Sequence, residues 1–278
     1  MFEQGHALCR RTRNHLLGTL ARALQEEGSM MQNQSDDRLA RERDFHNDRF
    51  GAVEARKEDT FYFAAEAAVA AYWKLVRQAT AGKDVLEYGC SNGQSSMRLA
   101  ASAKHISGID ISDVAIAQAK AEAVRRSISN VSFSVGNAEK MDFPPASFDV
   151  VFGSGILHHL NLEEALTEIR RVLRPSGRAI FFEPLGHNPA INLYRRRTPE
   201  ARTVDEHPLL KSDFSIVGQH FSRYDLQFFG LSTLASLPFR TLAAGRAIRA
   251  VGERVDNLLL KIPGLKWQAW IVVMVLEA

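Results

Sequence analysis

The sequence has little cysteine and no long apolar run. Among its 278 residues only Cys9 and Cys90 are cysteines, which are too few for a disulfide framework or a cysteine zinc site. No stretch reaches the roughly 18 uncharged apolar residues that a membrane-spanning helix needs. These two absences predict a protein without a transmembrane segment in a reducing compartment, the cytoplasm.

The sequence also lacks a large excess of charge of one sign. The chain carries 35 Lys and Arg against 32 Asp and Glu, a net charge of +3, so it has no overall field that would draw it onto nucleic acid. A hydrophobic content of 45% is enough to bury one sizeable core. We therefore expect one large domain with additional segments.

The stretch DVLEYGCSNG, residues 84–93, organises the rest of the chain. An apolar strand ends in the carboxylate of Glu87, and the small residues Gly89, Ser91 and Gly93 then form a tight turn before a helix opens. Such a strand, turn and helix start bring a ligand close to backbone. A pyrophosphate is disfavoured there, because a buried carboxylate would repel it.

Strand and helix patterns then alternate, which is typical of a doubly wound parallel sheet. Amphipathic helices are predicted from Ser112 to Arg126 and from Asn161 to Leu173, the second stopped by Pro175. Ligands of such folds bind at the carboxyl ends of the strands. The predicted strands are 85–88, 106–110, 131–135, 150–153 and 178–183.

The polar residues at these strand ends favour a nucleoside without phosphates. The third glycine of a dinucleotide fingerprint is displaced by one residue, to Gly93, which weakens a nicotinamide interpretation. Asp110 ends the second strand, where an acidic residue holds ribose hydroxyls in doubly wound folds.

Several motifs in order resemble the class I S-adenosylmethionine-dependent methyltransferases. VLEYGCSNG resembles the first motif of that family, GIDIS the second, and VGNAEKMDFPPASFDVV the third. SGILHHL and LRPSGRAIFFEP resemble the later motifs, so that the resemblance covers about residues 84–184.

The resemblance implies an α/β fold: a Rossmann-like, doubly wound, mostly parallel sheet of seven strands with a reversed last strand. Residues 224–229 and 267–276 are the candidates for strands six and seven. It also implies S-adenosylmethionine as cofactor and S-adenosylhomocysteine as product. The residues it assigns to the cofactor are Glu87, Gly89, Ser91, Gly93, Asp110, Ile111, Asn137, Ala138 and Gly153.

Two of these residues depart from the family pattern. Ser91 stands where glycine is usual, and we expect it to be tolerated only with a negative backbone φ. Asn137 stands where aspartate is common, and its amide oxygen still accepts a hydrogen bond from the adenine amine, with less charge assistance.

The candidates for catalysis are His158, His159 and Glu183. A histidine suits general-base chemistry near neutral pH, and His159 is slightly favoured because Leu157 and Leu160 indicate inward packing around it. Glu183 is expected to orient a histidine, act as base or hold an amine substrate. Hydrogen bonds of both histidines to loop backbone, and of Glu183 to the turn at 186–188, are the structural alternatives. Local spacing completes no metal ligand set.

The remaining segments are predicted to surround this domain. Residues 1–35 form a basic leader, either poorly ordered or an amphipathic helix for a membrane or partner, and residues 36–80 form a helical cap on the domain at 81–278. Insertions at about 185–212 and 231–265 are expected to shape the acceptor site. For the second insertion, core or lid packing is favoured over a dimer surface or a membrane contact.

The acceptor is expected to be a small molecule of secondary metabolism, a sugar derivative or a lipid-like compound, and a bulky apolar acceptor is one of these alternatives. Strand four lacks the motif associated with methylation of base amines, and no acidic pair is present to grip a guanidinium. O-methylation with a histidine base leads, followed by N- or C-methylation. A cyclase that uses the cofactor without methyl transfer, a nicotinamide oxidoreductase and a homo-oligomer are left open.

Overall fold

The computed structural model describes residues 34–51 and 62–278. The chain divides into two compact units, residues 1–44 and 45–278. Residues 34–51 are helical. The leader predicted at 1–35 therefore lies almost wholly outside the described residues, and the division into leader, cap and main domain stays a prediction.

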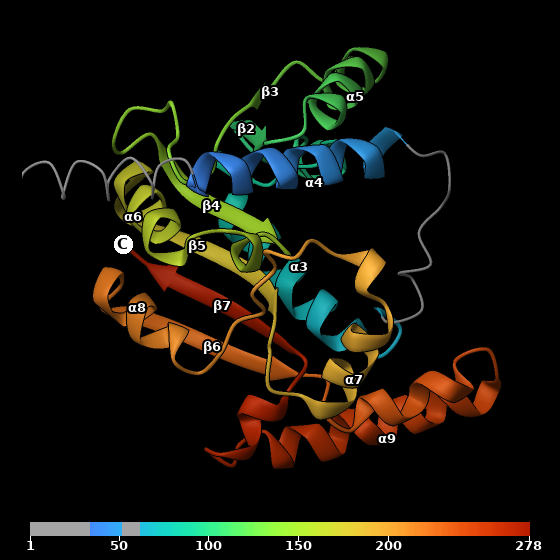
Figure 1. Cartoon of the computed structure of the whole chain (residues 1–278). Coiled ribbons are helices and arrows are strands. Elements are labelled where there is room, and N and C mark those ends of the chain that lie inside the picture. The colour runs from blue at the N-terminus through green and yellow to red at the C-terminus, as the bar shows by residue number, and fades with distance from the viewer. Residues whose placement is uncertain (1–33, 52–61) are drawn as a thin grey trace, which may run out of the picture. The chain divides into compact units, whose positions relative to one another are not determined.

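A seven-stranded sheet forms the centre of the second unit, in the order β3-β2-β1-β4-β5-β7-β6. Strands β1 to β5 pair in parallel and β7 is antiparallel to both its neighbours, so the doubly wound prediction with a reversed last strand is confirmed (Figure 1). The strands are β1 (Asp84–Tyr88), β2 (His105–Asp110), β3 (Val131–Val135), β4 (Phe148–Ser154), β5 (Leu173–Pro184), β6 (Arg223–Phe229) and β7 (Ile271–Glu277).

Side-chain caps define the two predicted crossover helices. The Ser112 hydroxyl accepts from the Ala115 N–H at the start of α5 (Asp113–Arg125), and the Asn161 side chain caps α6 (Leu162–Val172). The helix α6 ends at Val172 with Leu173 as its C-cap, so Pro175 lies two residues beyond the cap, within β5. Residues 267–270 belong to the short helix η4 (Leu265–Gln268) and the turn after it, not to the last strand.

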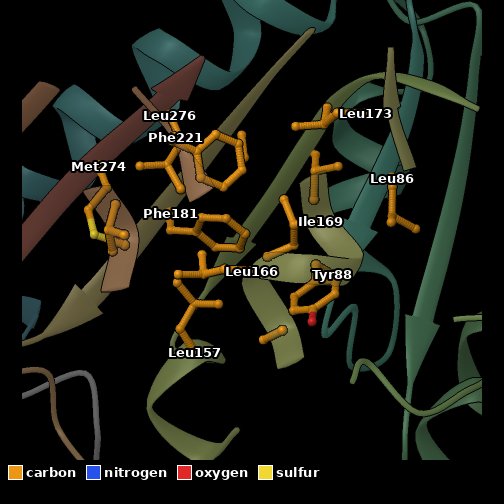
Figure 2. Close-up of a cluster of buried hydrophobic side chains, with 14 of the residues drawn as sticks. Leu86, Tyr88, Leu157, Leu166, Ile169, Leu173, Phe181, Phe221, Met274 and Leu276 are labelled. Carbon is orange, nitrogen blue, oxygen red and sulfur yellow. The ribbon is translucent and has the colours of Figure 1, made fainter. Parts of the chain in front are cut away.

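Two apolar layers cover the faces of the sheet. On one face α6 and α8 (Asp213–His220) pack on Leu86, Tyr88 and Phe181 (Figure 2). On the other face α3 (Glu66–Thr80) buries Tyr72 and other residues against the strands. The helix α4 (Gln94–Leu99) follows the first loop and contributes Leu99 to this second layer.

Each of the two insertions contains two helices. The first contains α7 (Pro189–Arg197) and η2 (Pro199–Ala201), and the second contains η3 (Thr233–Phe239) and α9 (Ala243–Leu259). No helix among residues 34–51 and 62–278 is long and apolar enough to span a bilayer.

The loops after β1, β2, β4 and β5 gather at the carboxyl edge of the sheet. The loop after β4 contains the short helix η1 (Leu157–His159).

Candidate active site

Glu87 lies at the end of β1 and fixes the start of α4. Its carboxylate accepts from the Ser96 backbone N–H at 2.9 Å and from the Ser96 hydroxyl. Burial raises the pKa of this carboxyl to about 7, although the hydrogen bonds from Ser96 act in the opposite direction. Glu87 therefore supports the first loop directly, and its role toward the methionine part stays a prediction.

Three residues of the first loop adopt left-handed backbone angles: Gly89 (φ 71°), Ser91 (φ 50°) and Gly93 (φ 72°). The expectation that Ser91 keeps a negative φ is wrong. Its backbone N–H donates to the Asp110 carboxylate at 2.8 Å, which helps hold a conformation that costs a non-glycine residue about 1–2 kcal/mol. The turn is thus tied to the end of β2.

Asp110 connects two loops. Its second oxygen accepts from the Ser112 N–H at 2.9 Å, and its pKa is raised by burial, opposed by backbone hydrogen bonds from Ser112, Ser91 and Ile111. The backbone of Ile111 therefore turns toward this carboxylate. Asp110 and the first loop come together as predicted from the strand ends.

The loop after β3 is closed by local hydrogen bonds. The Asn137 side-chain oxygen accepts from the Glu139 N–H at 2.8 Å, and the Ala138 carbonyl accepts from the Tyr88 hydroxyl at 2.6 Å. An amide oxygen has two lone pairs, so Asn137 retains one for a ligand.

Ile156 packs between β1 and β4. A Cβ atom built on Gly89 or on Gly153 would lie 2.9 Å from the Ile156 side chain. Both positions therefore need glycine for close packing, and Gly89 needs it also for its positive φ. The Gly153 carbonyl accepts from the Tyr72 hydroxyl at 3.0 Å, and the role of Gly153 toward the cofactor stays a prediction.

These residues fit S-adenosylmethionine better than a phosphate-bearing nucleotide. Carboxylates end both β1 and β2, where they suit a cation and ribose hydroxyls respectively. Among the residues assigned to the cofactor there is no Lys or Arg to balance a pyrophosphate. Glu87, Asp110 and Asn137 with the backbone of the first loop would hold the cofactor.

Glu183, fully buried at the end of β5, joins that strand to the loop after β4. One oxygen accepts from the backbone N–H groups of Ile156 and Leu157 at 2.9 and 3.0 Å, and the other lies 2.8 Å from His158 Nδ1. The alternative that Glu183 bonds the turn at 186–188 is therefore wrong. The carboxylate meets His158, and not the slightly favoured His159.

His159 has a different acidic neighbour. Its Nε2 lies 3.7 Å from a Glu206 oxygen, while Arg202 Nε lies 3.4 Å from the other Glu206 oxygen. His158, His159 and Glu206 each offer a ligand atom within 4.8 Å of the others. Local spacing missed Glu206, because a segment more than 40 residues away supplies it.

The first insertion reaches this pair of histidines. The His207 backbone N–H donates to the His158 carbonyl at 2.7 Å, and a bridge between Leu185 and Leu209 holds the insertion against the end of β5. His187 instead accepts from the Lys211 N–H at 3.0 Å. Residues 205–209 therefore lie beside the two histidines, and the role of this insertion toward an acceptor stays a prediction.

Part of the chain is similar to known proteins. Residues 86–181 match the family described as methyltransferase domain. Over 101 residues the chain is 36% identical to 27-O-demethylrifamycin SV methyltransferase of Amycolatopsis mediterranei, covering 35% of this chain and 37% of that protein. It is 31% identical over 144 residues to the S-adenosyl-L-methionine-dependent Diels-Alderase iccD of Talaromyces variabilis, covering 49% and 44%.

A solved structure shares the fold. The YcgJ protein of Bacillus subtilis superimposes with a TM-score of 0.52 at 16% identity, covering 74% of this chain and 96% of that one. The chain thus spans less than half the length of the two curated relatives and nearly all of this structure.

The sheet order and the strand-end site define a Rossmann-like domain. The matched segment describes this domain more narrowly: residues 86–181 form a methyltransferase domain, and the relatives support the class I S-adenosylmethionine-dependent type.

Proposed function

We propose that the protein transfers a methyl group from S-adenosylmethionine to an oxygen of a small-molecule acceptor, with His158 as general base. The observation that carries this proposal is the buried pair of His158 and Glu183, joined at 2.8 Å. The similarity to an O-methyltransferase supports the choice of oxygen.

The hydrogen bonds of Glu183 select the tautomer of His158. Glu183 already accepts two backbone N–H groups on one oxygen, and its other oxygen is satisfied by a proton on His158 Nδ1. The Nε2 atom then carries a lone pair that takes a proton from the acceptor hydroxyl. A fixed ring and an oriented lone pair are what a general base requires.

The cofactor supplies an activated methyl group on a positively charged sulfur when it is bound. The chain has to align the acceptor oxygen, exclude water and remove the proton. The histidine pair is buried, and the 205–209 segment beside it is half-buried except for the buried Leu209 and the exposed His207. The two together would exclude water on the acceptor side. Bulky apolar acceptors with a hydroxyl group are the class we infer.

The test is the variant Glu183→Gln, compared with His158→Ala and His159→Ala. The amide oxygen of the new glutamine can still accept the two backbone N–H groups, but its NH₂ group faces His158 Nδ1 and favours the tautomer with a protonated Nε2. We expect kcat to fall by about 10²- to 10⁴-fold in Glu183→Gln and His158→Ala, with less effect in His159→Ala.

The assay uses radiolabelled S-adenosylmethionine with 27-O-demethylrifamycin SV and simple phenols as first acceptors. Binding of S-adenosylhomocysteine, measured by calorimetry, is the control and should be unchanged in all three variants. Full turnover in both His158→Ala and Glu183→Gln would refute the base assignment. A loss confined to His159→Ala would transfer the role to that residue.

A cyclase is the second candidate function, favoured by the similarity to a Diels-Alderase. The two functions differ in product mass, because methyl transfer adds a CH₂ unit and cyclisation adds nothing. Mass spectrometry of the product, together with measurement of the S-adenosylhomocysteine formed, distinguishes them.

A further inference from the structure

The helix α9 is amphipathic, and part of its apolar face is exposed, whereas Ile248 and Leu259 are half-buried. Its buried residues are Gly245, Gly252 and Asp256. A Cβ atom on Gly252 would lie 3.0 Å from the Thr233 backbone, so α9 packs closely on η3 through small residues. The expectation of core packing for this segment is therefore wrong for the exposed apolar residues of α9.

Those apolar side chains point to solvent. Val251, Val255 and Leu258 are 57%, 37% and 69% exposed. Their spacing of four and three residues places them within an arc of about 60° on a helix with 100° per residue. We call this row the apolar stripe of α9.

The stripe continues at both ends. Ala244 and Ala247 extend it toward the start of the helix, so that at 1.5 Å per residue it is about 20 Å long. Leu242 precedes the helix and Ile262 follows it, 57% and 50% exposed. In Figure 1 α9 lies outside the layer of strands. Single exposed apolar residues are normal, but a continuous row marks a surface that interacts.

The charges beside the stripe are all positive. Arg254 and Lys261 border it, and Arg246 lies farther around the same exposed side. Both acids of α9 are directed elsewhere: Glu253 pairs with Arg249 at 3.4 Å, and the buried Asp256 accepts from the backbone N–H groups of the loop before η3. The stripe thus has a cationic border and no exposed acid on its own helix.

We propose that α9 binds the surface of a membrane with anionic lipid headgroups. An exposed apolar stripe with a basic border suits the boundary between acyl chains and anionic headgroups. A second copy fits worse, because two such borders would face each other with like charge. A protein partner also fits worse, since the stripe on α9 consists of Ala, Val and Leu without the aromatic anchors of protein interfaces.

The experiment is flotation of the full chain with vesicles of phosphatidylcholine, with and without phosphatidylglycerol. We expect binding only to the anionic vesicles. The double variant Arg254→Glu and Lys261→Glu should bind at least ~25-fold more weakly, because each basic residue near such a surface contributes about fivefold. Leu258→Asp should weaken binding by ~10-fold or more.

Matched controls carry the same changes elsewhere. Val124→Asp alters an 80% exposed apolar residue on α5, and the double variant Arg98→Glu and Lys120→Glu makes the same change in net charge at other exposed positions. Both should bind as the unaltered protein does. Thermal unfolding of every variant checks that it is folded.

The proposal fails if the full chain does not bind anionic vesicles, or if the α9 variants bind as well as their controls. It also fails if sedimentation shows a dimer that Leu258→Asp dissociates while no vesicle binding occurs, since the stripe would then be an interface between copies. Methyl transfer does not enter any of these measurements, so their outcome is independent of the proposed reaction.

Discussion

Replacing Glu87 by Gln tests the electrostatics of the first loop. Burial raises the pKa of Glu87 from 4.5 to about 7. Between these pH values the folded chain keeps a proton that the unfolded chain releases, so the free energy of unfolding falls as pH rises. A difference of about 2.5 pH units corresponds to about 3 kcal/mol, which is fully lost above pH 7.

In Glu87→Gln this loss disappears, because the side chain no longer titrates. The free energy of unfolding of the cofactor-free protein is measured by urea titration at pH values between about 4.5 and 8. From the lowest to the highest pH, the unaltered protein should lose about 3 kcal/mol more of this free energy than the variant does. The exposed carboxyl variant Glu164→Gln is the control and should run parallel to the unaltered protein. Parallel curves for Glu87→Gln as well would refute the reasoning.

Two further changes act on the same loops. Asp110→Asn should weaken S-adenosylmethionine binding by about 10-fold to 100-fold in calorimetry, since a hydrogen bond to a charged group contributes about 1.5–3 kcal/mol; unchanged affinity would contradict the ribose role of Asp110. Gly93→Ala should lower the free energy of unfolding by at least about 2 kcal/mol, because its φ is 72° and a Cβ would lie 2.5 Å from the Phe133 ring; a variant as stable as the unaltered protein would show that the loop rearranges.

The fold was largely predictable from the sequence because its signals are local. Strands β1 to β4 lie within a few residues of their predicted positions, and the two predicted helices begin after Ser112 and Asn161, whose side chains cap them. Alternating apolar strands and capped amphipathic helices are set by neighbours along the chain. The error at 267–270 has the same origin, because Trp267 reads as apolar strand and packs instead on Phe214 and Phe228.

The sequence predicted which residues lie in the candidate site, but not the contacts between them. Local sequence placed His158, His159 and Glu183 together at one edge but did not say which histidine meets the carboxylate, because that choice depends on loop geometry. Glu206 had no signal at all, since its position depends on the pairing of Leu185 with Leu209. The left-handed angle of Ser91 is likewise supported by a hydrogen bond that its N–H donates to Asp110, outside its own loop.

The packing of Ile156 limits which substitutions the loop after β4 can accept without a change in the first loop. Its side chain fills the space above Gly89 and Gly153, while its N–H is held by Glu183. A substitution in the loop after β4 that changes acceptor choice would therefore also disturb the turn of the first loop. The segments at 185–212 and 231–265 attach outside this contact, so substitutions there leave the packing of Ile156 on Gly89 and Gly153 intact.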